Sequence, residues 1–176
     1  DIAFAATYCR RQRRVFLCDG DALIIPQKRL LNILTEIKKQ LPWVTRIGLY
    51  ANAKSLDLKT PDERKQLKAH AIGIAYRGIE TGDDVTRKNI NKGASSGHMI
   101  EMGKKAREAG IKLSITVLLG IAGRERSIIH AEETGRVLSA IDPEYVGALS
   151  LMLIPGTPLY NDFKAGKFIL IEPDEM

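Results

Sequence analysis

Acidic side chains follow two of the apolar segments in this chain. Asp19-Gly20-Asp21 comes directly after the apolar run 14–18, and Glu80 closes the apolar run 72–79. The two aspartates could accept hydrogen bonds from an ammonium group, with Gly20 allowing close approach to the backbone. The two oxygens of Glu80 suit a pair of neighbouring ribose hydroxyls. Taken alone, Asp19–Asp21 is explained as well by an ordinary acidic turn.

Two further positions support a binding site at the segment ends. Asn52 follows the run 46–50 and offers both a donor and an acceptor, although asparagine is also a common turn former. Side chains alternate along a strand, so Tyr76, Gly78 and Glu80 share one face. A carboxylate beside a glycine at the end of an apolar strand indicates ligand contact more than core packing.

The run that ends in Leu118-Leu119-Gly120-Ile121 provides apolar residues and a glycine that could form a flat wall for an adenine ring. It has neither the spacing of a dinucleotide fingerprint nor the lysine of a phosphate-binding loop. Arg124 and Arg126 follow, and either could hold a ligand carboxylate through paired hydrogen bonds. The alternative is a helix-entry loop with solvated arginines.

The elements that must position these residues alternate between strands and helices. Five β-rich apolar runs start about 26 to 41 residues apart, the length of a strand with its crossover helix. They are 14–18, 46–50, 72–79, 113–119 and 145–153. Their near-continuous hydrophobicity predicts parallel strands covered on both faces. Five strands cannot close an eight-stranded barrel, so the fold is an open doubly wound sheet or a partial barrel, with ligands at the carboxyl ends of the strands.

Helix signals lie between these runs. Pro26 is expected at the first position of a helix that continues to Leu41. Thr60-Pro61-Asp62-Glu63 has the pattern of a capping box. Further helices are expected from Ser95 or Ser96 to Gly110, from Ser127 to before Asp142-Pro143, and from Leu159 to Lys164. Asp1–Arg10 reads as part of a helix, so the chain is expected to be an internal piece of a longer protein.

Composition narrows the class of protein. The 176 residues are 44% hydrophobic and 27% charged, values that exclude intrinsic disorder. No apolar run reaches the roughly 18 residues that span a bilayer, and no signal peptide is visible. The cytoplasm is the expected location.

Charge and cysteine content give weaker indications. The net charge is +6, with a basic run at 10–14 that fits either a nucleic-acid surface or a solvated helix end. No aromatic residues are interleaved for base stacking. Cys9 and Cys18 do not have zinc-site spacing, and Cys18 is expected to be a small core residue.

Taken together and in order, these segments resemble the core of the radical S-adenosylmethionine enzymes, including the branch of oxygen-independent coproporphyrinogen oxidase and several RNA-modifying enzymes. The resemblance covers residues 1–165, with residues 166–176 expected to begin a C-terminal extension. It rests on the segments Val15–Asp21, Gly78–Asp83, Ile90-Asn91-Lys92-Gly93, Ala109–Ile111, Leu118–Gly123 and Pro155-Gly156-Thr157-Pro158-Leu159-Tyr160. The fold that it implies is an α/β partial (β/α)6 barrel, of which this chain supplies strands two to six.

The resemblance implies cofactor-binding roles for specific positions. Asp19, Gly20 and Asp21 stand where the family usually has Gly-Gly-Glu, which binds the amino group of S-adenosylmethionine. Glu80 stands at a cofactor-contacting acidic position, and Leu118, Gly120 and Ile121 stand where a strand packs on adenine. The resemblance places Ile154 and Pro155 beside the adenine edge. The full set of expected cofactor-binding residues is Asp19, Gly20, Asp21, Asn52, Gly78, Glu80, Leu118, Gly120, Ile121, Arg124, Ile154 and Pro155.

The resemblance also implies a reaction. The family binds a 4Fe–4S cluster through a C-x-x-x-C-x-x-C motif, expected here before residue 1, because neither Cys9 nor Cys18 matches it. A reduced flavodoxin or ferredoxin supplies the electron, and S-adenosylmethionine yields a deoxyadenosyl radical that abstracts hydrogen from a substrate. Two alternatives stay open: an RNA-binding or RNA-modifying module, and a cluster-free barrel lyase that holds phosphate through Arg124 and Arg126.

Overall fold

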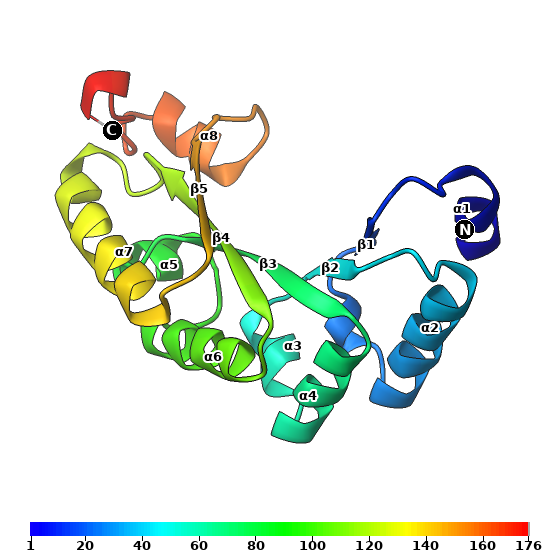
Figure 1. Cartoon of the computed structure of the whole chain (residues 1–176). Coiled ribbons are helices and arrows are strands. Elements are labelled where there is room, and N and C mark those ends of the chain that lie inside the picture. Colours follow the sequence, from blue (N-terminus) through cyan, green and yellow to red (C-terminus); the bar gives the residue numbers. More distant parts are fainter. Residues whose placement is uncertain (176) are drawn as a thin grey trace. The chain divides into compact units, whose positions relative to one another are not determined.

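The computed structural model describes residues 1–175, and its strands form one five-stranded sheet in the order β1-β2-β3-β4-β5 (Figure 1). The strands are β1 (Arg14–Leu17), β2 (Arg46–Tyr50), β3 (Ile72–Glu80), β4 (Lys112–Leu119) and β5 (Tyr145–Ser150). The prediction of a parallel α/β sheet, as in a partial barrel, is confirmed. The last strand is three residues shorter than its apolar run, because the backbone leaves the sheet after Ser150.

Register places matching side chains of neighbouring strands on one face. Strands β1 and β2 are parallel with Arg14 opposite Arg46 and Phe16 opposite Gly48. Strands β2 and β3 are parallel with Tyr50 opposite Tyr76. Because side chains alternate along a strand, every second residue projects from the same face. On one face these are Arg14 and Phe16 of β1, Arg46, Gly48 and Tyr50 of β2, and Ile74 and Tyr76 of β3.

Helices separate the strands, as the spacing predicts. They are α1 (Ile2–Tyr8), α2 (Gln27–Gln40), α3 (Ala53–Asp57), α4 (Pro61–Ala69), α5 (Asp84–Asn89), α6 (Ser96–Glu108), α7 (Ser127–Ile141) and α8 (Pro158–Lys164). Short 3-10 turns lie at η1 (Ala22–Ile24), η2 (Arg124–Arg126) and η3 (Pro173–Glu175). Pro26 is the N-cap of α2 rather than its first residue. The short helices α3 and α5 were not predicted, because five or six residues carry too little periodicity.

Local end signals work as expected elsewhere. Thr60 and Glu63 form the predicted capping box of α4, with Thr60 accepting from the Glu63 N–H and Glu63 accepting from the Thr60 N–H. Gly110 follows α6 with a φ of 76°, a left-handed value that suits glycine. Within the described residues, no helix combines the length and apolar character needed to cross a lipid bilayer.

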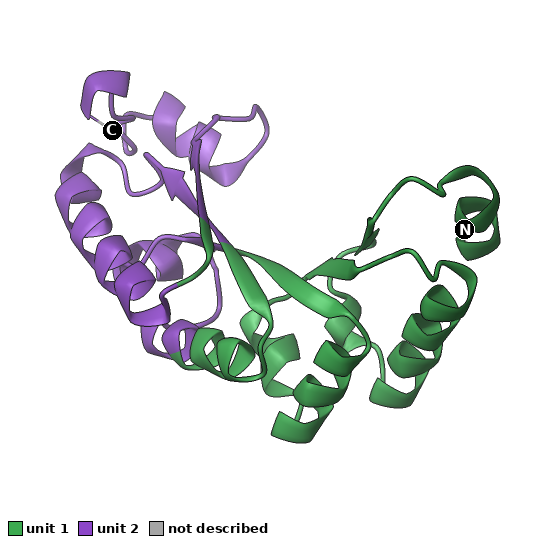
Figure 2. Ribbon diagram, in the orientation of Figure 1, with its two compact units in different colours: residues 1–77, 101–114, 143–145 green, residues 78–100, 115–142, 146–176 purple. Residues whose placement is uncertain are grey.

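The chain divides into two compact units (Figure 2). Unit 1 comprises residues 1–77, 101–114 and 143–145, and unit 2 comprises residues 78–100, 115–142 and 146–176. In unit 1, Leu30 and Leu34 of α2 are fully buried, as is Leu49 of β2. In unit 2, Ile79 of β3, Ile115 of β4 and Val137 of α7 are buried.

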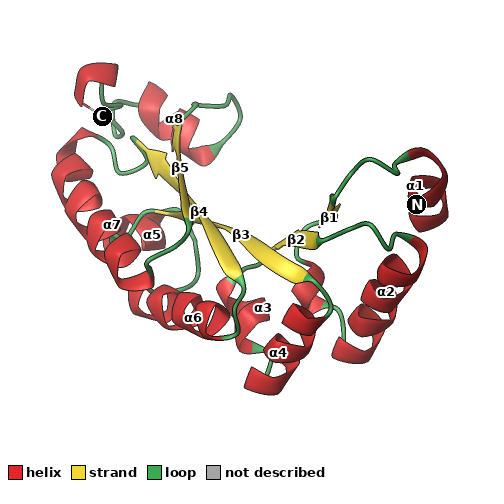
Figure 3. Cartoon of the chain, in the orientation of Figure 1, coloured by secondary structure: helices red, strands yellow, loops and turns green. Residues whose placement is uncertain are grey.

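Two burial predictions are wrong. Cys18 is exposed, because β1 ends at Leu17 and the chain leaves the sheet there. The strands are not covered on both faces. Every residue of β5 is exposed. In unit 1, α2 and α4 lie on one side of β1 and β2 (Figure 3), while Phe16 and Tyr50 on the other side are 36% and 53% exposed.

Candidate functional site

The loop after β1 is anchored by Asp21. One oxygen of its carboxylate accepts the Leu23 N–H at 3.1 Å, and the other accepts the Asn52 N–H at 3.0 Å. These bonds tie the loop that follows β1 to the loop that follows β2, both in unit 1. Asn52 itself caps α3, since its side-chain oxygen accepts the Ser55 N–H at 2.9 Å. Asp21 and Asn52 therefore have structural partners as well as rim positions.

Asp19 differs from Asp21. Its side chain is exposed and makes no hydrogen bond or ion pair to any described residue. Its backbone has a φ of 66°, and Gly20 follows with a φ of 80°. Asp is one of the few residues apart from glycine that adopts this left-handed region. Two consecutive left-handed residues turn the chain sharply, and the carboxylate of Asp19 is left available to a ligand.

Glu80 ends β3 in a strained conformation. Its φ is 60°, and the Thr81 N–H donates to the Ile79 carbonyl at 2.7 Å, so Glu80 is the central residue of a three-residue turn. A Cβ on Gly78 would overlap the Glu80 carboxylate, which shows that the side chain folds back over Gly78 on the same face. Strain of this kind persists where the surroundings fix it and is concentrated at functional sites.

Arg87 of α5 holds the backbone on both sides of Glu80. Its Nη1 donates to the carbonyls of Ile79 and Thr81 at 2.8 and 3.0 Å, the two residues on either side of Glu80. Its Nε donates to the Ala94 carbonyl at 2.7 Å. The side chain is buried, and this burial lowers the pKa of Arg87 from its usual value. Arg87 is therefore a positioning residue for Glu80.

The Glu80 carboxylate is paired on one oxygen. Lys92 Nζ lies 2.6 Å from Glu80 Oε1, and both side chains are partly exposed. Among the described residues, Oε2 has no partner and remains able to accept hydrogen bonds from a ligand.

The loop after β3 is clamped to the start of α7 within unit 2. Asp83 accepts two hydrogen bonds from the Arg126 guanidinium, each of 2.8 Å, and a third from Thr86 Oγ1 at 2.6 Å. The bonds from Arg126 hold the pKa of Asp83 well below its ordinary value. Next to this pair, His130 Nδ1 lies 2.8 Å from Thr81 Oγ1, and burial lowers the pKa of His130.

Gly82 allows the loop after β3 to lie close to the backbone of α7. Its N–H donates to Thr134 Oγ1 at 2.9 Å. A Cβ at this position would overlap the backbone carbonyl of Glu133 and come within 2.6 Å of the Thr134 nitrogen. Only glycine allows the loop to approach the α7 backbone so closely.

The apolar residues predicted for adenine come together in part. A cavity of about 370 Å³ in unit 2 is lined by Ile121, by residues 151–154 and by residues 89–91, among others. Gly120 has a φ of 82° and turns the chain after β4 so that Ile121 is buried against this cavity. Leu118 is half-buried and does not line the cavity.

The turn after β5 also has the predicted form. Thr157 Oγ1 accepts the Tyr160 N–H and donates to the Ile154 carbonyl at 2.8 Å. Pro155 is exposed in this turn and does not line the cavity, whereas Ile154 does.

The two arginines after β4 have protein partners. Arg124 contacts Glu175 at 2.9 Å, and Arg126 is held by Asp83. The phosphate grip expected of a cluster-free lyase therefore has no support in this loop.

Sequence reasoning missed the roles of Lys92 and Arg87. Lys92 lies in the quoted segment Ile90–Gly93, twelve residues after Glu80. The signal available in the sequence was the basic Lys92 a short distance after the acidic Glu80, with the short helix α5 between them. Arg87 gave no signal, because a charged residue in a short helix reads as a solvated one.

Metal-binding residues are not grouped in this part of the protein. Cys9 and Cys18 are both free thiols. Among residues 1–175, no three His, Cys, Asp or Glu side chains lie close enough together to hold a metal ion.

Comparison with solved structures identifies the fold. Coproporphyrinogen III oxidase from Escherichia coli, a radical S-adenosylmethionine enzyme, is 11% identical with a TM-score of 0.71, over 99% of this chain and 41% of that chain. Methylornithine synthase is 17% identical with a TM-score of 0.69, over 90% of this chain and 45% of that one. The radical S-adenosylmethionine methyltransferase TsrM from Kitasatospora setae, with cobalamin and a [4Fe-4S] cluster bound, is 16% identical with a TM-score of 0.66, over 89% and 31% of the two chains.

The chain has the fold of the radical S-adenosylmethionine enzyme core, and it spans less than half the length of these proteins. No protein-family model and no curated protein sequence matches it.

Proposed function

We propose that this chain is the S-adenosylmethionine-binding core of an enzyme that generates a deoxyadenosyl radical and abstracts hydrogen from a substrate. The proposal rests on the conformation and the contacts of Glu80. It is a strained, partly buried carboxylate at the end of β3, fixed by Arg87 and Lys92, with one oxygen left for a ligand. A residue with only a packing role would not need this arrangement.

Unit 2 suits the adenosyl part of the ligand. The cavity beside Ile121 offers an apolar wall for a base, and the backbone groups between Leu151 and Ile154 can bond its polar edge. Asn91 lines this cavity and directly precedes Lys92, which holds Glu80. In the proposal, Oε2 of Glu80 accepts hydrogen bonds from the ribose hydroxyls.

Unit 1 suits the amino group. Asp19 and Asp21 both follow β1, but only Asp19 has no bond to a described residue. We assign the ammonium contact to Asp19 and a loop-anchoring role to Asp21. The sequence alone left both aspartates as candidates.

The cluster has no ligands in this part of the protein. The described residues do not fit a 4Fe–4S cluster, because they contain two unpaired cysteines and no metal-binding group. In the proposed enzyme, cysteines outside residues 1–175 bind the cluster, which supplies one electron to the cofactor. A reduced flavodoxin or ferredoxin is the proposed donor. What these residues contribute is binding, orientation and exclusion of water.

Replacing Glu80 with glutamine tests the function. We expect the affinity of the anaerobically reconstituted full-length protein for S-adenosylmethionine to fall about tenfold, because a charge-assisted hydrogen bond is lost. Isothermal titration measures this affinity. Glu132→Gln removes an exposed carboxylate of α7 that has no partner among the described residues, and it should leave the affinity unchanged. Equal affinity of Glu80→Gln and wild type would refute the proposed role.

A second pair of variants separates Asp19 from Asp21. Asparagine tolerates left-handed backbone, so Asp19→Asn is expected to keep wild-type stability while weakening cofactor binding about tenfold. Asp21→Ala loses the bonds to Leu23 and Asn52 and is expected to lower the free energy of unfolding by about 1–2 kcal/mol. Urea denaturation and titration of both variants give the comparison. If Asp21→Ala weakens binding and Asp19→Asn does not, the assignment is reversed.

A further inference from the structure

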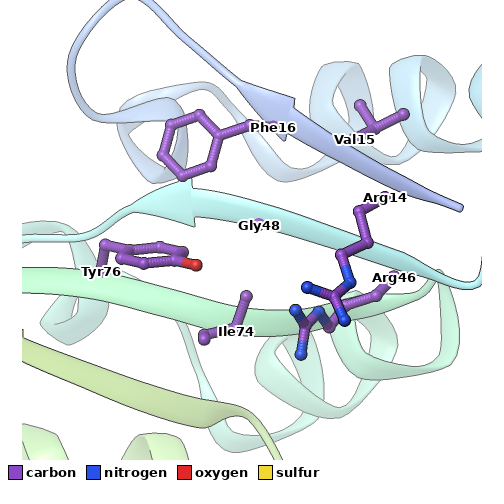
Figure 4. Close-up of a pocket in the computed structure, with 7 residues that line it drawn as sticks. All are labelled: Arg14, Val15, Phe16, Arg46, Gly48, Ile74 and Tyr76. Carbon is purple, nitrogen blue, oxygen red and sulfur yellow. The ribbon is translucent and has the colours of Figure 1, made fainter. Parts of the chain in front are cut away.

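Two arginines lie directly opposite each other at the start of the sheet in unit 1. Arg14 is the first residue of β1, Arg46 is the first residue of β2, and they are register partners. Figure 4 shows their guanidinium groups close together on the same face. Like charges directly opposite on neighbouring strands destabilise a sheet. An anion bound between the two guanidinium groups would relieve this repulsion.

The described residues supply no such anion. Neither Arg14 nor Arg46 makes a hydrogen bond or ion pair with a described residue. Arg87 and Arg126, by contrast, are each held by several protein oxygens. The two guanidinium groups therefore keep their donors for a ligand.

A cavity adjoins the arginine pair. It has a volume of about 190 Å³ and is lined by Phe16, Gly48, Ile74 and Tyr76 as well as the two arginines (Figure 4). Gly48 forms its floor, since a Cβ there would come within 3.1 Å of the Phe16 ring and 3.2 Å of Ile74. A side chain at position 48 would fill the space between the rings.

Aromatic rings extend from the cavity along the same face. The centroids of Phe16 and Tyr76 are 5.5 Å apart, and those of Phe16 and Tyr50 are 4.8 Å apart, in edge-on arrangements. Phe16 and Tyr50 are partly exposed rather than covered by other residues. An apolar ring of a ligand would find edges and faces to pack against here.

We propose that Arg14 and Arg46 form a binding site for an organic carboxylate or phosphate that carries a flat apolar group. Two guanidinium forks bind the oxygens of either anion in paired hydrogen bonds. The ring of the ligand packs on Phe16 and Tyr76. The anion site follows from unit 1 alone and does not rest on the proposed function.

Phenyl phosphate, benzoate and inorganic phosphate are the probes. Each is titrated into the full-length protein without S-adenosylmethionine, at an ionic strength held constant with sodium chloride. We expect saturable binding of at least one aromatic anion, about tenfold or more weakened in the double variant Arg14→Gln/Arg46→Gln. The tighter of phenyl phosphate and benzoate identifies the anion. If neither binds, or if the double variant binds as wild type does, the proposal is overturned.

Matched variants exclude a general charge effect. Arg11→Gln/Arg29→Gln removes the same charge from exposed arginines that have no partner among the described residues, and it should bind the probes as wild type does. Phe16→Leu should abolish the preference for phenyl phosphate over inorganic phosphate, and a preference that survives this change overturns the role of the ring. Without probe, the double variant at 14 and 46 should unfold at the same temperature as wild type or higher, because repulsion is relieved.

The proposed anion site and the proposed cofactor site can be tested independently. The double variant at 14 and 46 should keep wild-type affinity for S-adenosylmethionine, since its residues lie at the amino ends of the strands and the cofactor residues follow the carboxyl ends. Loss of cofactor affinity in Glu80→Gln with unchanged anion binding is the matching result. Loss of both ligands in either variant would contradict a separate anion site.

Discussion

Replacing Arg87 with methionine is expected to lower the free energy of unfolding by about 3 kcal/mol and to weaken S-adenosylmethionine binding about tenfold or more. Methionine fills a similar volume but donates no hydrogen bond. The carbonyls of Ile79, Thr81 and Ala94 then lose their buried partner. Because two of these carbonyls flank Glu80, the strained turn should relax and the carboxylate should leave its position. Urea denaturation measures the first effect and isothermal titration the second.

Two variants distinguish positioning from simple loss of charge. Arg87→Lys keeps the charge, but a single ammonium cannot reach the three carbonyls as the guanidinium does, so it should recover only part of the stability. Lys88→Met removes the neighbouring exposed cation of α5 and should change neither quantity. Wild-type cofactor affinity in Arg87→Met would show that Glu80 is not held by Arg87.

The succession of strands and helices along the chain could be predicted from the sequence, because its signals are local. Each strand is a short apolar run, and the intervening lengths fit one crossover helix. The capping box at Thr60 and the glycine after α6 fix helix ends through bonds within a few residues. Parallel pairing then follows from the connections alone. This is why the fold class was correct despite identities of only 11 to 17% to the solved structures compared.

Which charged side chains pair with one another could not be predicted in the same way. Asp83 and Arg126 are 43 positions apart, and nothing in the spacing shows that they meet. Arg124 and Arg126 look alike in the sequence as ligand-binding cations, yet each ends in an ion pair with a protein carboxylate. The two aspartates after β1 are equally similar, and only the fold shows that Asp21 is bonded while Asp19 is not.

The prediction that the strands are covered on both faces was also wrong, and the exposed face carries the proposed anion site. Apolar strands were expected to be covered on both faces, but Phe16 and Tyr50 are left partly open. Hydropathy reports how apolar a strand is, and not whether the layer on its second face belongs to the protein or to a ligand. The basic run at 10–14 was ambiguous for the same reason. Its last residue, Arg14, gains meaning only from Arg46, which the register places beside it.

The clamp between the β3 loop and α7 depends most strongly on Asp83. Its carboxylate is buried and accepts from Arg126, from Thr86 and from backbone N–H groups. Replacement by asparagine keeps the shape but removes the charge that pairs with Arg126. We expect the free energy of unfolding at pH 7 to fall by about 3 kcal/mol, as for other buried pairs that lose one partner. Asp57→Asn, an exposed change in α3, should have little effect.

The pH dependence gives Asp83 a signature that a general loss of packing would lack. The bonds from Arg126 lower the pKa of Asp83 in the folded protein, so the unfolded chain binds its proton at a higher pH than the folded one. The stabilisation is therefore complete above the ordinary aspartate pKa of about 3.9 and is lost as the pH falls toward the lower folded value. The difference in unfolding free energy between wild type and Asp83→Asn should stay constant from about pH 7 to 5 and shrink between about pH 4 and 2. His130 titrates near Asp83, so a difference that already changed between pH 7 and 5 would assign the stabilisation to the histidine instead of the carboxylate.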